Sequence, residues 1–149
     1  MSVRRFTSRT LRVFDLTLSE ARQLGRECDG TSLEYVVLAL SREHDGIPGK
    51  ALRSLSIYLE PLRGRVESVL ATKNWHMPSH LPHTHRFLVL ERVAREEAEL
   101  LGSNSIDAEH VALAVIRLDE GSRVLPLLGI NGHAWRMEIL RLMQRRVSI

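Results

Sequence analysis

Apolar residues recur at three- and four-residue steps in two separate parts of the chain, a spacing typical of the buried face of an amphipathic helix. Arg, Glu and Gln fill many of the positions between them, as expected for a face in contact with water. The apolar-face positions are Val13, Leu16, Thr17, Ala21 and Leu24 in the first part and Leu90, Val93, Ala94, Ala98 and Leu101 in the second. The pattern predicts two matching helices, with Thr7 and Thr84 as N-caps and Gly25 and Gly102 where the helices stop.

A longer apolar run follows each of these helices. The segments "SLEYVVLAL" (32–40) and "DAEHVALAV" (107–115) are apolar along almost their whole length, which is too long and too even for a surface helix. Ser32 and Asp107 are both favourable N-cap residues. We therefore expect each run to be the central helix of its half of the chain.

Two shorter helices are expected to complete each half. A third helix spans about residues 49–55 and again about 122–128, and a fourth opens near Pro61 and again near His133. Pro126 should end or kink its short helix early, because proline cannot continue the backbone hydrogen bonds. Strand signals are few, so the fold class is all-α with eight helices.

The two halves are copies of one another. The twenty residues "FTSRTLRVFDLTLSEARQLG" (6–25) align without gaps on "HTHRFLVLERVAREEAELLG" (83–102), 77 positions later. The two apolar runs also align, with an offset of 75 positions. A period of this kind indicates a repeat architecture. The sequence predicts two tandem four-helix repeats with a pseudo-twofold relation, a first repeat over 6–70, a linker over 71–82 and a second repeat over 83–147.

Composition changes this picture little. The chain has 149 residues, of which 44% are apolar, so it is large enough to bury a core without cross-links. Its one cysteine, Cys28, excludes an internal disulfide, and the longest apolar runs, such as 35–40, are too short to cross a bilayer. The first residues show no apolar stretch typical of a secretion signal, which makes a cytoplasmic protein the expectation.

The charges are largely interleaved, with 21 basic and 18 acidic residues. Such a mild excess does not indicate a nucleic-acid-binding stripe. Arginines gather at the two ends of the chain, at Arg4, Arg5, Arg9 and Arg12 and at Arg141, Arg145 and Arg146. Both groups are interpreted as solvated faces.

Four histidines lie within the segment "WHMPSHLPHTH" (75–85) and raise the question of a metal site. His83 and His85 flank Thr84 and so belong to the start of a predicted helix. His76 and His80 lie in a connector with two prolines, which offers neither a regular local structure nor cysteine and carboxylate ligands. The favoured interpretation is a histidine-rich linker, and no metal is predicted.

No catalytic motif is recognisable. The nearest approach to a phosphate-binding loop, "GIPGKAL" (46–52), has the wrong spacing and an alanine where a hydroxyl is needed. No Ser-His-Asp order is suggested, and Cys28 has no histidine that the repeat would place beside it. We expect a non-enzymatic binding protein without a cofactor.

The repeated signatures resemble those of the Clp N-terminal domain, the double Clp repeat at the front of the ClpA, ClpB and ClpC unfoldases. "FTSR" with "EARQLG", and then "SLEYVVLAL" and "DAEHVALAV", are similar to that family's F-T-x-R, EA-x-x-LG and T-x-EHLLLAL. The resemblance covers nearly everything from Phe6 to about Met143. It implies an all-helical module that is most often monomeric.

The resemblance also implies a function. Such modules receive protein substrates or dock adaptors for an AAA+ unfoldase, so this chain would be a protein-binding module of the Clp system. It could instead be a free-standing decoy that competes with an unfoldase N-domain for adaptors or peptide antibiotics. The sequence leaves open whether the chain stands alone or is part of a longer unfoldase.

Two kinds of ligand site are implied by the same resemblance. Some family members bind phosphoarginine with a threonine at the start of the first helix and a glutamate at the start of the second, which correspond to Thr7 and Glu34 and to Thr84 and Glu109. All four could equally be helix caps and charges that complement the helix dipole.

Peptide antibiotics bind some members between the first helices of the two repeats. Here Phe6 and His83 occupy the positions that flank this groove.

An alternative of another class is a nucleic-acid binder, since short helix pairs and a pI near 9.6 can mimic a helix-turn-helix protein. The uniformly apolar second helix of each copy argues against it, because a recognition helix must show polar side chains to base edges. We therefore expect protein partners, with no nucleic acid and no membrane.

Overall fold

The computed structural model describes residues 5–23, 33–43, 45–72 and 83–147. These ranges contain eight helices and two short strands. The first half comprises β1 (Arg5–Phe6), α1 (Ser8–Gln23), α2 (Leu33–Arg42), α3 (Ile47–Ser54) and α4 (Leu59–Thr72). The second half comprises α5 (His83–Leu100), β2 (Ser105–Ile106), α6 (Ala108–Ser122), α7 (Val124–Leu127) and α8 (Gly132–Val147). The predicted all-α fold is confirmed.

Most predicted helix boundaries agree with the structure. Asp107 is the N-cap of α6, as expected, and α7 has only four residues with Pro126 among them. One expectation is wrong, because α5 begins at His83 and Thr84 therefore lies inside its first turn rather than before it. Gly25 and Ser32 lie outside the described residues.

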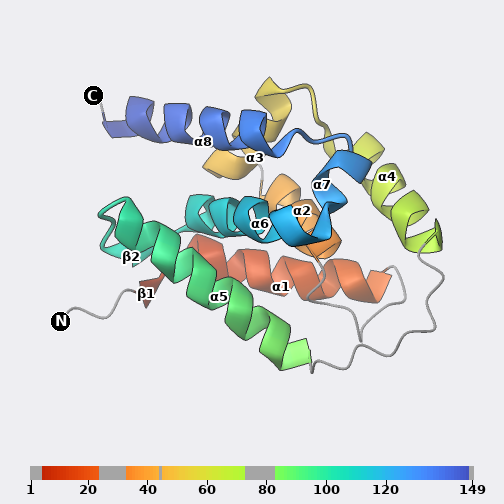
Figure 1. Cartoon of the computed structure of the whole chain (residues 1–149), viewed down its shortest axis with the longest axis horizontal. Coiled ribbons are helices and arrows are strands. Elements are labelled where there is room, and N and C mark those ends of the chain that lie inside the picture. The colour runs from red at the N-terminus through yellow and green to blue at the C-terminus, as the bar shows by residue number, and fades with distance from the viewer. Residues whose placement is uncertain (1–4, 24–32, 44, 73–82, 148–149) are drawn as a thin grey trace.

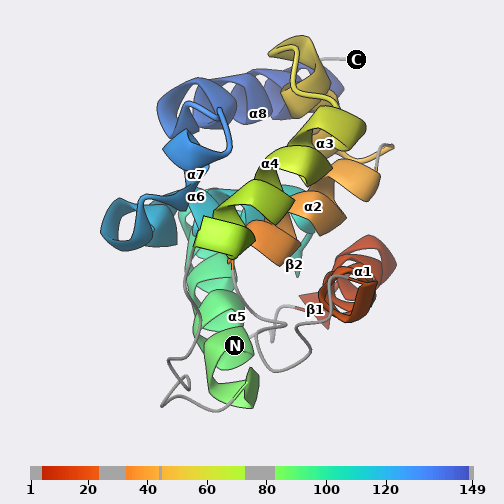
Figure 2. The ribbon, with the colours of Figure 1, turned by 90° about the vertical axis from the view of Figure 1, so that its right-hand side faces the viewer.

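The helices form three layers (Figure 1), with α3 and α8 on one side, α2 and α6 in the middle, and α1 and α5 on the other side. The view at right angles shows α4 and α7 along the flank of the middle layer (Figure 2). Each layer combines one helix from each repeat. The helices of the two repeats are therefore packed against one another in every layer. The boundaries of the repeats and the linker stay a prediction.

The middle layer forms the core. All residues of α2 from 34 to 41 are buried, and so are all residues of α6 from 108 to 115. A helix that is apolar all round must be covered on every side. The other six helices supply this cover, and the buried apolar residues of both repeats belong to a single cluster.

The two strands were not predicted. β1 pairs with β2 in parallel, with Arg5 opposite Ser105 and Phe6 opposite Ile106. The pairing continues into Thr7, whose backbone N–H donates to the Ile106 carbonyl at 3.0 Å. These bonds fix the start of α1 beside the start of α6, although the two lie in different repeats.

Trp135 connects the outer layer of one repeat to the other repeat. The side chain is fully buried in α8, and its Nε1 donates to the carbonyl oxygen of Pro48 in α3 at 3.2 Å. Trp135→Ala should lower the free energy of unfolding by about 3–5 kcal/mol, because a large cavity and an unpaired carbonyl would remain. Chemical denaturation measures this change.

The matched control is Met137→Ala, two residues further along the same helix. Met137 is exposed, so its truncation should change stability by less than about 0.5 kcal/mol. Equal effects of the two substitutions would contradict the packing of α8 on α3.

Candidate ligand-binding site

The hydroxyl group of Thr7 caps α1 and also reaches the other repeat. Its Oγ1 accepts from the backbone N–H of Thr10 at 3.3 Å, as an N-cap side chain does, and donates to Oδ1 of Asp107 at 2.9 Å. The buried hydroxyl of Thr10 donates to the carbonyl oxygen of Ile106 at 2.8 Å. Thr7 is therefore held on both sides, at the point where α1 meets α6.

Asp107 occupies the corresponding cap position of α6. Its Oδ1 accepts from the N–H of Ala108 at 2.7 Å, and its own N–H donates to Nδ1 of His110 at 2.9 Å. This reciprocal arrangement is a capping box in which histidine takes the place of the usual Glu or Gln. The Asp107 carboxylate thus serves α6 and Thr7 at once.

The pairing of the predicted ligand residues crosses the repeats. The family resemblance groups Thr7 with Glu34, but the structure places Thr7 against Asp107, two residues before Glu109. Glu34 is buried in the first turn of α2, and the side chain of Thr84 lies outside the described residues. Thr7 of the first repeat therefore lies beside the start of α6, the helix that carries Glu109 of the second.

Glu109 is the most unusual group of this site. Its residue is 1% exposed, and Nη1 of Arg146, from the last turn of α8, donates to its Oε1 at 2.9 Å. Burial raises the pKa of Glu109, and the nearby Asp107 raises it further, while Arg146 opposes both effects. The start of α6 thus carries a carboxyl group that is costly to ionise and that is paired with a guanidinium group.

His110 adds a buried donor. The residue is 2% exposed, and burial lowers the pKa of its ring, which is therefore neutral at pH 7. Because Nδ1 accepts from Asp107, the ring proton lies on Nε2. That Nε2 has no hydrogen-bond partner among the described residues.

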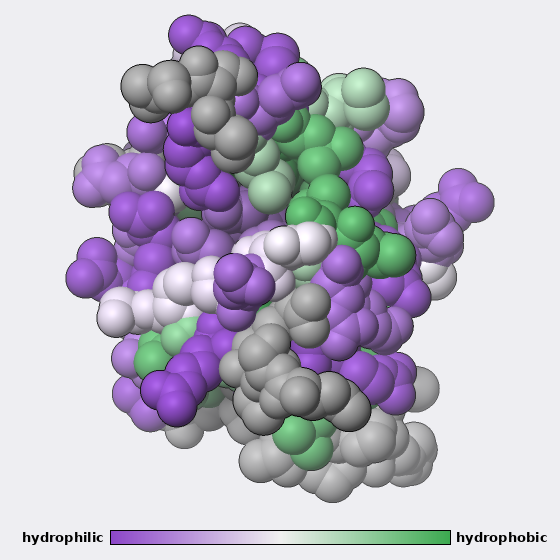
Figure 3. Space-filling view, turned by 90° about the vertical axis from the view of Figure 1, so that its left-hand side faces the viewer, coloured by the Kyte–Doolittle hydropathy of each residue, from purple (hydrophilic) through white to green (hydrophobic). Residues whose placement is uncertain are grey.

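Phe6 is packed rather than free. Its ring lies edge-to-face with Phe14 at 5.7 Å between centroids, and the guanidinium of Arg95 in α5 lies 5.8 Å from its centroid. It therefore connects α1 with α5. The side chain of His83, the other predicted groove residue, lies outside the described residues. The side of the molecule seen in Figure 3 is largely hydrophilic, with a patch of apolar side chains at the upper right.

Three residues at the junction of α1, α6 and α8 were missed or only partly understood from the sequence. Asp107 was expected to cap α6 but not to hold Thr7, and His110 was not singled out. Arg146 was interpreted as part of a solvated face; its side chain is indeed 51% exposed, but the interpretation missed that its guanidinium also pairs with buried Glu109. The spacing from Asp107 to His110 is that of a capping box, with histidine in place of the usual Glu or Gln, and was a local signal for these two residues. The pairing of Glu109 with Arg146 had no such signal, because the two are 37 positions apart.

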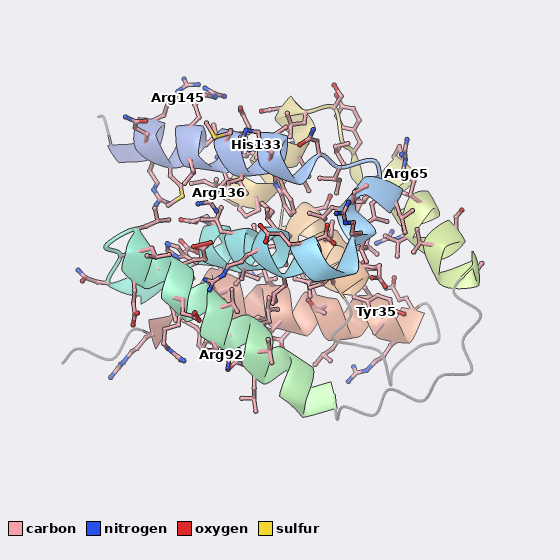
Figure 4. All side chains as sticks on the ribbon, viewed as in Figure 1. Tyr35, Arg65, Arg92, His133, Arg136 and Arg145 are labelled. Atoms are coloured by element: carbon pink, nitrogen blue, oxygen red, sulfur yellow. The ribbon has the colours of Figure 1, made fainter. Side chains whose placement is uncertain are left out.

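Other acidic residues also hold arginines, but in a different setting. Glu97 in α5 accepts from Arg136 of α8 at 3.4 Å, and the matching Glu20 in α1 accepts from Arg63 of α4 at 2.6 Å. Figure 4 shows Arg136 directed from α8 toward the neighbouring helices. Because the pair recurs in both repeats between helices, we assign it to the packing of the repeat.

The remaining expectations about sites concern metals and membranes. Within the described residues no group of three or more metal-ligating side chains occurs. The side chains of His76, His80, His83 and His85 lie outside that part of the chain. None of the described helices is long and apolar enough to cross a membrane.

Comparison with known proteins fits the double repeat and the layered helices. The family model of the Clp repeat (R) N-terminal domain matches residues 5–128. The chain belongs to this family. The match confirms the predicted resemblance. In Clp ATPases this domain is generally a protein-interaction module.

Longer relatives share the Clp repeat domain. This chain is 36% identical over 140 residues to chaperone protein ClpC2, chloroplastic, of Oryza sativa subsp. japonica. It is 35% identical over 140 residues to chaperone protein ClpC, chloroplastic, of Pisum sativum. Each alignment covers 93% of this chain and 15% of the relative. A solved structure, the N-terminal domain of the chaperone ClpD from Arabidopsis thaliana, has the same fold with a TM-score of 0.72, 22% identity, and coverage of 94% of this chain and 95% of that one.

The raised pKa of Glu109 predicts a specific pH dependence of stability. The folded state binds this proton more readily than the unfolded state, in which the pKa is near its ordinary value of 4.5. The resulting stability is fully present below that pH and is lost as pH rises through the higher folded-state pKa. Wild type and Glu109→Gln, which cannot titrate, should be compared by urea denaturation across this range.

The free energy of unfolding of the wild type, relative to that of the variant, should fall as pH rises through this interval. A difference that stays constant or grows with pH would show that the folded-state pKa is not raised.

Proposed function

We propose that this Clp repeat domain is a non-enzymatic receptor for protein segments that present an arginine side chain, free or phosphorylated. The observation that carries the proposal is the buried carboxylate of Glu109, which already binds the guanidinium of Arg146. Thr7, Asp107 and Glu109 form the described site. The segments would belong to substrates or adaptor proteins of a Clp unfoldase.

The chemistry of the site supports a guanidinium ligand. A carboxylate accepts the planar fork of arginine through two parallel hydrogen bonds, and burial strengthens this interaction. The N–H groups at the start of α1 favour negative charge and could receive a phosphate on the same ligand. Asp107 opposes this second contact, because its carboxylate lies beside Thr7. The guanidinium is therefore the part of the ligand that the site selects.

The repeat implies a second site of the same kind. Glu34 matches Glu109 and is likewise buried in the first turn of a central helix. By the pseudo-twofold relation, Thr84 would contribute to this second site as Thr7 does to the first. The proposal is therefore two arginine sites in one chain.

The names of the relatives indicate the setting. They include chaperone proteins of the ClpC type and, in Brassica napus, an ATP-dependent Clp protease ATP-binding subunit that is 35% identical over 140 residues. A domain of this family can serve such an ATPase as its own receiving module or, as a separate chain, compete for the same adaptors. Both settings use the same site.

The burial of α2 and α6 supports protein rather than nucleic-acid partners. A recognition helix must expose side chains to the groove, whereas residues 34–41 and 108–115 are all buried. The helix-turn-helix alternative has no support in the described structure.

Calorimetric titration with phosphoarginine and with Nα-acetylarginine amide tests the proposal. The wild type should bind two molecules, Glu109→Gln should bind one, and the double variant with Glu34→Gln should bind none. Loss of the charged acceptor should weaken each site on the order of tenfold or more.

The control is Glu120→Gln, an exposed glutamate of α6 that should leave both sites intact. Unchanged binding by the double variant would refute the assignment of the two glutamates. Arginine recognition itself would be refuted if neither ligand gave heat, both with the wild type and with a variant lacking Arg146.

A further inference from the structure

The side chain of Arg146 forms an ion pair with Glu109, the carboxylate of the described site. It comes from the last turn of α8 and reaches the first turn of α6, where its Nη1 lies 2.9 Å from Oε1 of Glu109. The contact joins a buried carboxylate to a side chain that is 51% exposed. One end of this ion pair is thus fixed in the core and the other is open to solvent.

This asymmetry makes the guanidinium exchangeable. Glu109 cannot move without disturbing α6, and an uncompensated buried charge is strongly unfavourable. Arg146 lies in the last turn of α8, where a helix commonly frays, and Glu109 is its one hydrogen-bond partner among the described residues. The carboxylate therefore requires a cation, but it does not require this one.

The orientation of the neighbouring arginine supports a specific contact. Arg145 has the same charge and lies on the same turn, yet it is directed away from α6 (Figure 4). Its electrostatic interaction is with Glu138 on its own helix. General attraction between α8 and the acidic start of α6 would apply to both arginines, whereas only Arg146 reaches Glu109.

We propose that Arg146 is an internal competitor that occupies the Glu109 site until an arginine of a protein partner displaces it. This inference rests on the proposed function and concerns the regulation of the same site. Ligand binding would exchange one guanidinium for another and release the last turn of α8. Only molecules in which Arg146 has left Glu109 can bind the ligand. The apparent Kd would therefore equal the intrinsic Kd divided by the fraction of such molecules.

Calorimetric titration of three variants tests the proposal. All three are made in a parent that carries Glu34→Gln, which leaves a single site. The variants carry Arg146→Gln, Arg146→Lys or Arg145→Gln, and the probes are phosphoarginine and Nα-acetylarginine amide. Arg146→Gln should bind on the order of tenfold more tightly than the parent, because an internal ligand that is bound 90% of the time raises the apparent Kd about tenfold.

Arg146→Lys should fall between Arg146→Gln and the parent, since lysine keeps the charge but lacks the fork. Arg145→Gln should match the parent within about twofold, because Arg145 does not reach the site. Arg146→Lys also covers the case in which Arg146→Gln fails to fold.

Unchanged or weaker binding by Arg146→Gln and Arg146→Lys would overturn the competitor role while leaving the receptor intact, since the parent would still bind. No binding by any variant, Arg146→Gln included, would overturn the proposed function itself.

A measurement without ligand tests the contact separately. Amide hydrogen exchange at residues 144–147 should accelerate in Arg146→Gln and not in Arg145→Gln. Equal exchange in both variants would show that Arg146 does not hold the last turn of α8, and this result would overturn the proposal.

Discussion

The complete burial of α2 and α6 is the constraint on which the rest of the structure depends. Each of these helices is apolar along nearly its whole length, so neither can be stable unless the other helices surround it. One repeat alone offers too few helices for this cover. The outer layers therefore combine α1 with α5 and α3 with α8, and Trp135 of the second repeat is buried against the first.

The same constraint creates the site. A buried helix still begins with backbone N–H groups that need acceptors, and α6 obtains one from the side chain of Asp107. This polar start must lie near the surface, where β1, β2 and the start of α1 join it. Glu109 is the second residue of the helix and is 1% exposed, so its carboxyl group lies inside the protein. A carboxylate in that position needs a cation, and Arg146 supplies one in the free chain.

The role proposed for the pair rests on where it lies in the fold rather than on its strength. The ion pair of Glu97 with Arg136 also joins a buried acid to a partly exposed arginine, but a matching pair, Glu20 with Arg63, occurs in the other repeat. The pair of Glu109 and Arg146 joins instead the start of α6 to the end of α8, and Glu109 is next in the chain to His110, whose Nε2 has no hydrogen-bond partner among the described residues. Exchange of the cation there would not require the core to move.

Local patterns were sufficient to predict the helices, because period and capping are properties of neighbouring residues. The face of α1, the central position of α6, the cap at Asp107 and the short α7 with Pro126 all followed from them. The family relationship followed from the same motifs.

Contacts between distant residues could not be predicted in this way. The pairing of β1 with β2 involves two residues on each side and has no periodic signature. Thr7 and Asp107 are 100 positions apart, and both had a satisfactory local role as caps. Arg146 shares a helix face with Ile139, Leu142 and Met143, a spacing that distinguishes it from Arg145. Its partner Glu109 is 37 positions away, so the spacing could not indicate the ion pair.

A crystal structure of the domain with an arginine-containing peptide bound tests the account most directly. We expect the guanidinium of the peptide to lie on the carboxylate of Glu109, with the Arg146 side chain displaced and Asp107 still bonded to Thr7. A peptide bound elsewhere, with Arg146 still on Glu109, would contradict the central claim that this carboxylate is the receptor.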